Sequence, residues 1–487
     1  MRKRRCSLGW VAVVALGLSS LSIGADDDWL EVQSEHFVIT TNGKEKTARR
    51  FAKELETIRQ IFRMALRGIT EGGPPLQVLA AKNEKTLRAL VPQFKTAGRF
   101  LPAGVFFRTP DKNWMVVNLD TRGDNPYAVA YHEYFHSLAL PAWPRAPLWL
   151  HEGLAGVWEN TVIHKKRVDA ARPSMIYLQT LKNTKMMSLR DLLLVNQLSR
   201  EYREAHRATI FYAQSWALVH YIFLGAGLAD AMGPYVRAIN KGTEPIGAFE
   251  KAFGDIDDIE EKLRHYIRKF QFNILRIDKP AEADAASFPS FTLTKRQYHA
   301  RVGSYFASIM QLDEAMEHSE RALALDSDDS LAHETMGIVH FRRHEYQQAG
   351  GSFERSAALN AARHLPRFYL AIIESSTATT PEGIDRIRDN FERSVRANPC
   401  HAPSLSRLAL IYGINREQAE AALWMGRRAA ALLPDDAMSL ASLGVAERLN
   451  GNNEAAVRAF ERALDIDPET EIARRLLTEL QNEKPDS

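Results

Sequence analysis

Histidine and glutamate residues near position 130 form the pattern with the clearest chemistry in the chain. His132 and His136 lie four residues apart, and Glu133 follows the first of them. On a helix this spacing places both imidazoles on one face, within reach of a single ion, while Glu133 is rotated by about 100° from His132. Neutral imidazoles suit zinc, and a carboxylate so placed acts on water at the ion without binding the ion. The pattern predicts a zinc site with Glu133 as general base; the alternative is a histidine pair with an incidental glutamate.

A catalytic zinc site needs a third protein ligand, and two adjacent residues compete for that role. Glu152 lies 16 positions after His136, and His151 directly precedes it. Both belong to an apolar segment after Pro147 that reads as a second helix, and the intervening loop is long enough for a return to the ion. Adjacent positions on a helix point about 100° apart, so only one of the two residues faces the ion. The residue types and their spacing leave both assignments open.

These side chains must be positioned by a mixed α and β region followed by helices. Asp124 or Asn125 is expected to cap the helix that carries the two histidines, Pro126 suits its first turn, and Pro141 ends it. Apolar residues at three- and four-residue spacing predict a long helix from Ala48 to Ala65. Strands are expected at 36–41, 76–80, 104–108 and 114–119, and essentially only helices after residue 125. We expect the strand from Trp114 to Leu119 to pair with an extended peptide at the cleft edge.

The second helix also carries a family resemblance. Its sequence, with Trp149, Leu150, Glu152, Gly153, Leu154 and Ala155, resembles the glutamate-bearing helix of gluzincin metallopeptidases. Together with the segment 29–37 and a helix around Tyr212, residues 29–275 resemble the bacterial peptidase MA-like (DUF1570-type) family of gluzincins. This resemblance implies an α+β zincin-like catalytic domain with a mostly helical C-terminal lobe.

The resemblance also implies roles for individual residues. It favours Glu152 over His151 as the third zinc ligand, beside His132 and His136. Tyr212 matches a tyrosine that donates its hydroxyl to the oxyanion of the reaction in aminopeptidase-like gluzincins, although a half-buried aromatic is the alternative interpretation. Gly156 stands four positions after Glu152, where an acidic partner for a zinc histidine is usual, so the sequence identifies no such partner.

The C-terminal part of the chain repeats itself. Gly303 and Ala315 recur 34 residues later as Gly337 and Ala349, and Gly444 with Phe460 shows the same relative spacing downstream. A 34-residue period with small residues where two helices cross resembles tetratricopeptide repeats. We expect about five units and a capping helix, an all-α solenoid over residues 290–481 that binds a protein or peptide partner. Residues 279–289, rich in Pro, Ala and charge, read as a linker after a domain at 26–278.

The N-terminus carries the pattern of an export signal. Residues 2–5 are basic, an apolar run extends from Leu8 to about Leu21, and small residues precede acidic ones at 26–28. We expect cleavage after residue 25 and a periplasmic or extracellular protein; the alternative is an uncleaved anchor, the one case with membrane contact. Removal of residues 1–25 leaves 59 basic against 60 acidic side chains of the 63 and 60 in the full chain. This neutral balance gives no reason to expect nucleic acid as a partner.

Taken together, the patterns predict an exported zinc-dependent metallopeptidase that hydrolyses peptide bonds with Glu133 as general base. Its repeats would bind a protein or peptide partner. One alternative is a catalytically inactive zincin-like scaffold whose repeats bind partner proteins. Another is a hydrolase of a different amide, such as a cell-wall peptide.

Overall fold

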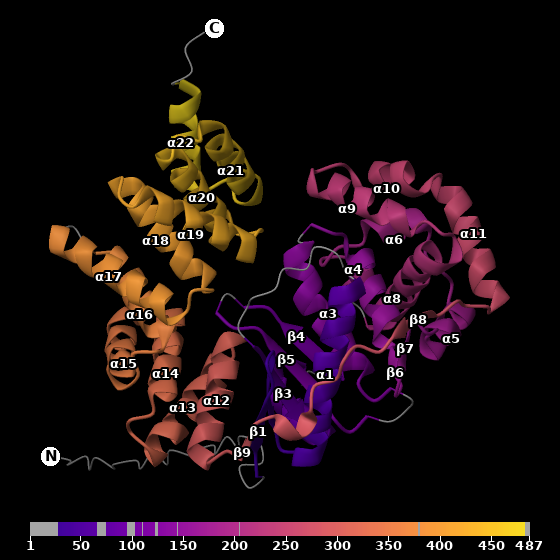
Figure 1. The fold of residues 1–487 in the computed structure, drawn as a ribbon, viewed down its shortest axis with the longest axis horizontal. Coiled ribbons are helices and arrows are strands. Elements are labelled where there is room, and N and C mark those ends of the chain that lie inside the picture. Colours follow the sequence, from indigo (N-terminus) through magenta and orange to yellow (C-terminus); the bar gives the residue numbers. More distant parts are fainter. Residues whose placement is uncertain are drawn as a thin grey trace, which may run out of the picture.

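The computed structural model of the 487-residue chain describes residues 28–65, 75–94, 103–109, 111–121, 125–143, 145–203, 205–377 and 380–482. The expected export signal at 1–25 lies outside these residues. Within them, a mixed sheet and a helical lobe are followed by an array of paired helices (Figure 1).

A six-stranded sheet forms the centre of the N-terminal region. Across the sheet its strands are β4 (Gly104–Phe107), β5 (Trp114–Asn118), β3 (Leu76–Ala81), β2 (Phe37–Thr41), β1 (Leu30–Gln33) and β9 (Ser290–Thr292). The β5–β3 and β3–β2 pairs are parallel, and the other pairs are antiparallel. The expected strand at 114–119 is therefore not at the edge of the sheet: β5 pairs on both sides, and β4 is the edge strand on that side. Sequence periodicity finds strands but not their order, which explains this error.

Alternate residues of the central strands serve two different cores. Val78 and Ala80 of β3 face α1 (Glu45–Ala65) and α3 (Ala128–Ala142). Leu79 and Ala81 face the opposite side, which is covered by α2 (Glu84–Leu90) and by α12 (Lys295–Ser308), the first helix of the array. Because successive side chains of a strand point to opposite faces, both faces need an apolar cover. The helical array provides part of it, and Figure 1 shows the sheet between α1 and α12.

A helical lobe follows α3. Its helices are α4 (Leu148–Glu159), α5 (Met175–Asn183), α6 (Leu189–Leu194), α7 (Arg200–Arg203), α8 (Ala205–His220), α9 (Met232–Asn240), α10 (Pro245–Phe253) and α11 (Ile256–Lys269). A second, antiparallel sheet of β6 (Val162–Ile163), β7 (Arg167–Ala170) and β8 (Leu275–Asp278) interrupts the expected run of helices. These strands have two to four residues, too few to produce a clear alternation in the sequence. Among the described residues, no single helix has the length and apolar character to cross a membrane, although the bent pair Thr209–Gly225 and Ala229–Asn240 passes by length and composition.

The segment expected to be a linker lies on the first domain. Arg49 of α1 donates to the backbone oxygen of Ala285 at 3.2 Å, and Lys53 pairs with Glu282 at 2.7 Å. The chain then forms β9, whose Thr292 lies opposite Leu30 in the sheet. Residues 290–292, at the start of the region expected to contain only repeats, therefore complete the sheet of the preceding domain.

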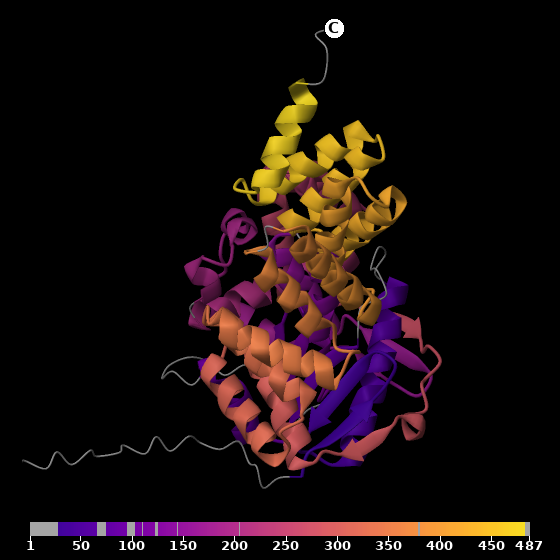
Figure 2. The ribbon, with the colours of Figure 1, turned by 90° about the vertical axis from the view of Figure 1, so that its left-hand side faces the viewer.

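The C-terminal helices form a repeat solenoid that resembles tetratricopeptide-repeat proteins. After α12 come α13 (Leu312–Leu325), α14 (Ser330–Arg342), α15 (Tyr346–Leu359), α16 (His364–Ser375), α17 (Pro381–Ala397), α18 (Ala402–Asn415), α19 (Ala419–Leu432), α20 (Ala437–Leu449), α21 (Asn453–Ile466) and α22 (Glu471–Asn482). The array climbs from the sheet to α22 (Figure 2). A Cβ added at Gly337 would lie 2.6 Å from the Phe353 ring, and one at Gly444 would lie 2.5 Å from the Phe460 ring. These close approaches explain the recurring glycines, since each pair of helices crosses where one has no side chain.

Candidate metal centre

The helix that carries the two histidines, α3, begins at a polar anchor. Tyr127 occupies its N-cap without a side-chain cap bond. Instead, Asn125 accepts from the Tyr127 amide at 3.0 Å and donates to the backbone oxygens of Glu159 at 2.7 Å and Thr161 at 2.8 Å. Asn125 thus ties the start of α3 to the end of α4. At its other end, α3 continues to Ala142, one residue past Pro141, where the sequence predicted its end.

Glycines in α4 let this helix lie close to α8. A Cβ at Gly153 would stand 2.5 Å from the backbone oxygen of Ser215, and one at Gly156 would stand 3.3 Å from the Tyr177 ring. A side chain at position 153 would push the two backbones apart. The close packing behind α4 fixes the direction in which the preceding residue, Glu152, points.

Three of the predicted ligands converge on one point. The Nε2 atoms of His132 and His136 are 3.1 Å apart, and Oε2 of Glu152 lies 3.2 Å from the first and 3.3 Å from the second. Their side chains are 14%, 13% and 6% exposed, respectively. One ligand atom from each lies within 4.8 Å of the others. The structure therefore brings together the residues that the spacing of α3 and the resemblance of α4 had suggested.

This arrangement fits a tetrahedral zinc ion. With zinc bonded to nitrogen and oxygen at about 2.0–2.1 Å, neighbouring ligand atoms of a tetrahedron lie about 3.3 Å apart, as these three do. Two imidazoles and one carboxylate are also the donor set of a catalytic zinc site with one open position. The three residues would hold the ion, and Glu133, one residue after His132, is partly exposed.

Glu159 is the acidic partner of His132 that sequence reasoning did not identify. Its Oε2 lies 3.0 Å from Nδ1 of His132, and it also accepts from Tyr177 at 3.3 Å. A hydrogen bond from Nδ1–H to a carboxylate leaves the lone pair of Nε2 directed at the metal position. Glu159 stands seven residues after Glu152, two helical turns along the same face of α4. The signal was present in the sequence, at i+7 rather than at i+4, where Gly156 stands.

His151, the rival ligand, is not one of the residues whose ligand atoms converge. Its Nε2 donates to the backbone oxygen of Trp143 at 3.1 Å, and its side chain is buried. Burial and the nearby charge of His136 lower the pKa of His151 to about 4, so the ring is neutral at pH 7. With one nitrogen bonded to the loop between α3 and α4, His151 helps to hold that loop in place.

Charge coupling within the cluster is strong. Burial lowers the pKa of His132, but its hydrogen bonds with Glu152 and Glu159 outweigh burial and raise that pKa well above its usual value. Burial raises the pKa of Glu152, but the charge of His136 and the hydrogen bonds from both histidines bring it far below its usual value. The two histidines and Glu152 therefore stabilise opposite charges on one another.

Glu133 lies between the ligand cluster and the edge of the sheet. Burial raises its pKa above the usual value, against the lowering effects of His132, His136 and a hydrogen bond to the backbone of Phe106 in β4. The strand can come this close because Gly104 has no side chain: a Cβ there would stand 2.5 Å from Val129 of α3. A carboxyl group beside a pair of histidines is suited to accept and release a proton.

Two tyrosines from α7 and α8 complete this side of the site. Tyr202 donates to Oε1 of Glu152 at 3.3 Å, and its ring centroid lies 6.2 Å from that of Tyr212, its hydrogen-bonding neighbour. Tyr212 lies within α8 rather than at its start. Its expected role as an oxyanion donor stays a prediction. The sequence did not predict a role for Tyr202, because this residue lies in the short helix α7, which carries no recognisable motif.

No family model matches the chain, and no curated protein matches it. Solved structures of repeat proteins do. YrrB, described as "a TPR protein with an unusual peptide-binding site", matches with 19% identity over 37% of this chain and 90% of its own, at a TM-score of 0.29. TTC0263, a thermophilic TPR protein of Thermus thermophilus, matches with 18% identity over 38% of this chain and 99% of its own, at a TM-score of 0.28. MamA protein matches with 17% identity over 36% and 92%, at a TM-score of 0.27. The likeness is one of fold, to helical repeat proteins.

Proposed function

We propose that the chain is a zinc-dependent peptidase. The observation that carries the proposal is the convergence of Nε2 of His132, Nε2 of His136 and Oε2 of Glu152 at 3.1–3.3 Å from one another. A carboxyl group of raised pKa, Glu133, stands beside them. This combination of three ligands and a base is what hydrolysis of an amide requires.

Four residues besides the ligands have roles in the proposed reaction. A zinc ion held by the three ligands would supply a water molecule of lowered pKa and an electrophile for the carbonyl oxygen. Glu133 accepts a proton at its carboxylate and passes it to the leaving amine. Glu159 orients the His132 ring through Nδ1. Tyr202 and Tyr212 place phenolic hydroxyls on the Glu152 side, where the hydroxyl of Tyr212 would stabilise negative charge on the substrate oxygen.

The strand β4 is the natural place for a substrate backbone. It is the edge strand nearest Glu133, and an edge strand presents unpaired backbone groups. An extended peptide can add to such an edge through main-chain hydrogen bonds. This assigns to β4 the role that we expected of the neighbouring strand. Peptide bonds in an extended segment are therefore the proposed substrate.

The test combines metal analysis with one substitution. Glu133→Gln removes the base but none of the ligands, so we expect about one zinc per chain in both proteins and a loss of peptide-library cleavage of about 10²-fold or more. Glu84→Gln, an exposed change on α2, serves as control and should leave both quantities unchanged. Equal cleavage by the wild type and Glu133→Gln would contradict the proposal. Zinc binding without cleavage in the wild type would favour a zincin-like scaffold that acts through its repeats.

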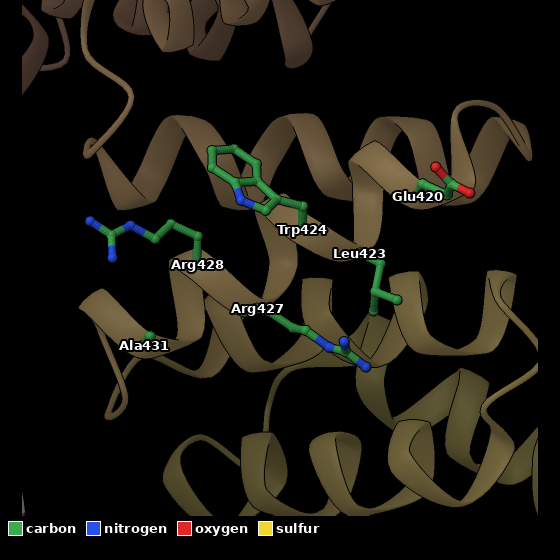
Figure 3. A pocket seen from close by; sticks show the side chains of 6 residues that line it. All are labelled: Glu420, Leu423, Trp424, Arg427, Arg428 and Ala431. Carbon is green, nitrogen blue, oxygen red and sulfur yellow. The ribbon is translucent and has the colours of Figure 1, made fainter.

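We also propose that the repeats bind a protein partner on α19. A hollow of about 430 Å³ on this helix is lined by Glu420, Leu423, Trp424, Arg427, Arg428 and Ala431 (Figure 3). Trp424 is 56% exposed, and tryptophan and arginine are enriched in protein interfaces. Trp424→Ala should weaken capture of that partner without changing zinc content.

Export is the remaining part of the proposal. The N-terminal pattern of a charged segment, an apolar run and small residues supports it. N-terminal sequencing of the protein from the extracytoplasmic fraction should find a chain that begins at about residue 26. Recovery of intact chains from the cytoplasm would contradict export.

A further inference from the structure

One turn of the N-terminal region contacts all five repeats. The β4–β5 turn, here meaning Arg108, Thr109, Asp111 and Lys112, follows the edge strand and projects toward the array. In every pair of helices its side chains reach the first helix or the residues just before it. These places are α12, α14, α16, the N-cap of α18 and the loop before α20. The partners are Ser304, Glu334, Tyr369, His401 and Asp435. A segment of the same chain thus lies on the surface formed by the first helices of the repeats, here called the inner surface.

Asp111 makes the central contact of this turn. Its carboxylate accepts from the Tyr369 hydroxyl at 3.0 Å and lies 3.4 Å from Nε2 of His401. Its side chain is 13% exposed, and that of His401 is 2% exposed. Although burial raises the pKa of Asp111, the hydrogen bonds from His401 and Tyr369 lower it below the usual value. The carboxylate is therefore charged and held by donors from two different repeats.

The residues on either side of Asp111 extend the contact in both directions along the array. Lys112 Nζ lies 3.2 Å from Oγ of Ser304 and 3.3 Å from Oε1 of Glu334, whose side chain is 2% exposed. Arg108 makes two bonds to Asp435, at 3.0 and 3.1 Å, in a more exposed position. The exposed pair contributes little, whereas loss of one partner of a buried pair is costly.

Hydrogen bonds within the turn join Thr109, which lies two residues after the end of β4, to Lys112 and Asn113. The Thr109 hydroxyl accepts from the Lys112 amide at 3.1 Å, and the Asn113 side chain accepts from the Thr109 amide at 3.3 Å. Phe106, the second-last residue of β4, lies with its backbone close enough to Glu133 to influence that carboxyl group, and Gly104 at the far end of the strand packs closely on Val129 of α3. The path from the repeats to Glu133 consists of this turn and of β4, a strand of four residues.

We propose that Asp111 is a positioning residue, which fixes the edge strand β4 beside Glu133 by docking the β4–β5 turn into the inner surface of the repeats. The repeats thereby act on the candidate site through the turn and β4, without contacting the ligands themselves in the contacts described above.

The test follows the amides of β4 by hydrogen exchange in the full chain. Asp111→Ala should raise exchange at Val105 and Phe106 about tenfold, while amides of β2 change less than about twofold. Tyr369→Phe removes the donor from the opposite side and should give a smaller rise at the same amides. In the double variant the two effects should not add, because both remove one contact. Asp328→Asn, which breaks an exposed ion pair with Arg355 between two repeats, is the matched control without effect on β4.

The effect of Asp111 on catalysis rests on the proposed function, whereas its effect on the position of β4 can be tested without it. Unchanged β4 exchange in Asp111→Ala, or an equal rise in all strands, would overturn the positioning role whether or not the chain hydrolyses peptides. If cleavage is observed, an increase in KM of about fivefold to tenfold with kcat within about twofold supports the role. A loss of kcat alone contradicts it. If wild-type chain binds zinc but cleaves nothing, the proposed function fails, and the exchange data still decide the role of Asp111.

Discussion

At the scale of single residues, the ligand cluster owes its geometry to side chains that do not touch the metal position. Asn125 joins α3 to α4, His151 holds the intervening loop, and Glu159 sets the orientation of the His132 ring. Each makes its contact with a backbone oxygen or a ligand nitrogen. The three ligands could not be held at 3.1–3.3 Å from one another by α3 and α4 alone, because histidine and glutamate side chains have several rotamers.

Glu159 gives a prediction at this scale. Glu159→Gln keeps an oxygen that can accept from Nδ1 of His132 but removes the negative charge that makes the imidazole a better donor to zinc. We expect zinc affinity to fall about 10- to 100-fold with little change in the thermal midpoint. Competition with a chromophoric chelator measures the affinity. Tyr177→Phe, which removes the second partner of Glu159, should have a smaller effect; equal affinity in wild type and Glu159→Gln would refute the role.

At the scale of elements, glycine positions decide how closely helices approach one another. Gly153 and Gly156 both lie on α4, yet an added Cβ meets a backbone oxygen at 2.5 Å in the first case and side-chain atoms at 3.3–3.4 Å in the second. A backbone oxygen cannot move without its helix, whereas a side chain can adjust. A side chain can therefore be accommodated at position 156 but not at position 153, although nothing in the sequence distinguishes the two glycines.

Substitution by alanine tests this difference. Gly153→Ala should lower the free energy of unfolding by about 1–3 kcal/mol, because the added Cβ is overpacked against Ser215. This loss is larger than the gain from the higher helix propensity of alanine. Gly156→Ala should be nearly neutral, because a gain of up to about 1 kcal/mol in propensity offsets a small adjustment of Tyr177 and Trp216. Thermal unfolding followed by circular dichroism measures both changes. A more stable Gly153→Ala chain would show that α4 and α8 can separate at no cost.

The first repeat contains a buried histidine pair with a consequence for pH. Nδ1 of His299 on α12 lies 3.1 Å from Nδ1 of His318 on α13. Burial, with the nearby charges of His299 and Arg321, lowers the pKa of His318 to about 3. Between about pH 6.5 and 3 the unfolded chain therefore binds a proton at this position that the folded chain does not bind. Stability falls as pH falls through this window and is unaffected by this group above it.

Replacement of His318 by phenylalanine should make that dependence shallower. We expect the slope of unfolding free energy against pH, between pH 6.5 and 4, to decrease by about 1 kcal/mol per pH unit. Urea unfolding at several pH values measures the slope. His265→Gln, at an exposed position of α11, is the control and should leave the slope unchanged. An unaltered slope in His318→Phe would show that other groups dominate the response to acid.

At the scale of the whole molecule, local patterns were predictable and distant contacts were not. The spacing of His132 and His136 and the 34-residue period both reflect relations within one or two helices, which sequence preserves. The i+7 spacing of Glu159 from Glu152 is present in the sequence, but it indicates a partner for His132 only if α4 extends two turns beyond Glu152. The order of β4 and β5 and the docking of Asp111 depend on pairings that no spacing encodes. Nor does any pattern in residues 279–289 indicate that they return to α1, since their composition is that of a linker.

The position of β9 determines when the N-terminal region can finish folding. When synthesis has reached residue 278, the chain contains every predicted metal ligand. The sheet, however, still lacks its sixth strand, β9. It also lacks α12, whose Tyr305 and Phe306 cover one face beside Trp114. Synthesis must pass about residue 308 before both faces of the sheet have their cover. A boundary drawn between the two regions in the sequence is therefore not a boundary in folding, and a fragment cut there would expose an apolar sheet face to water.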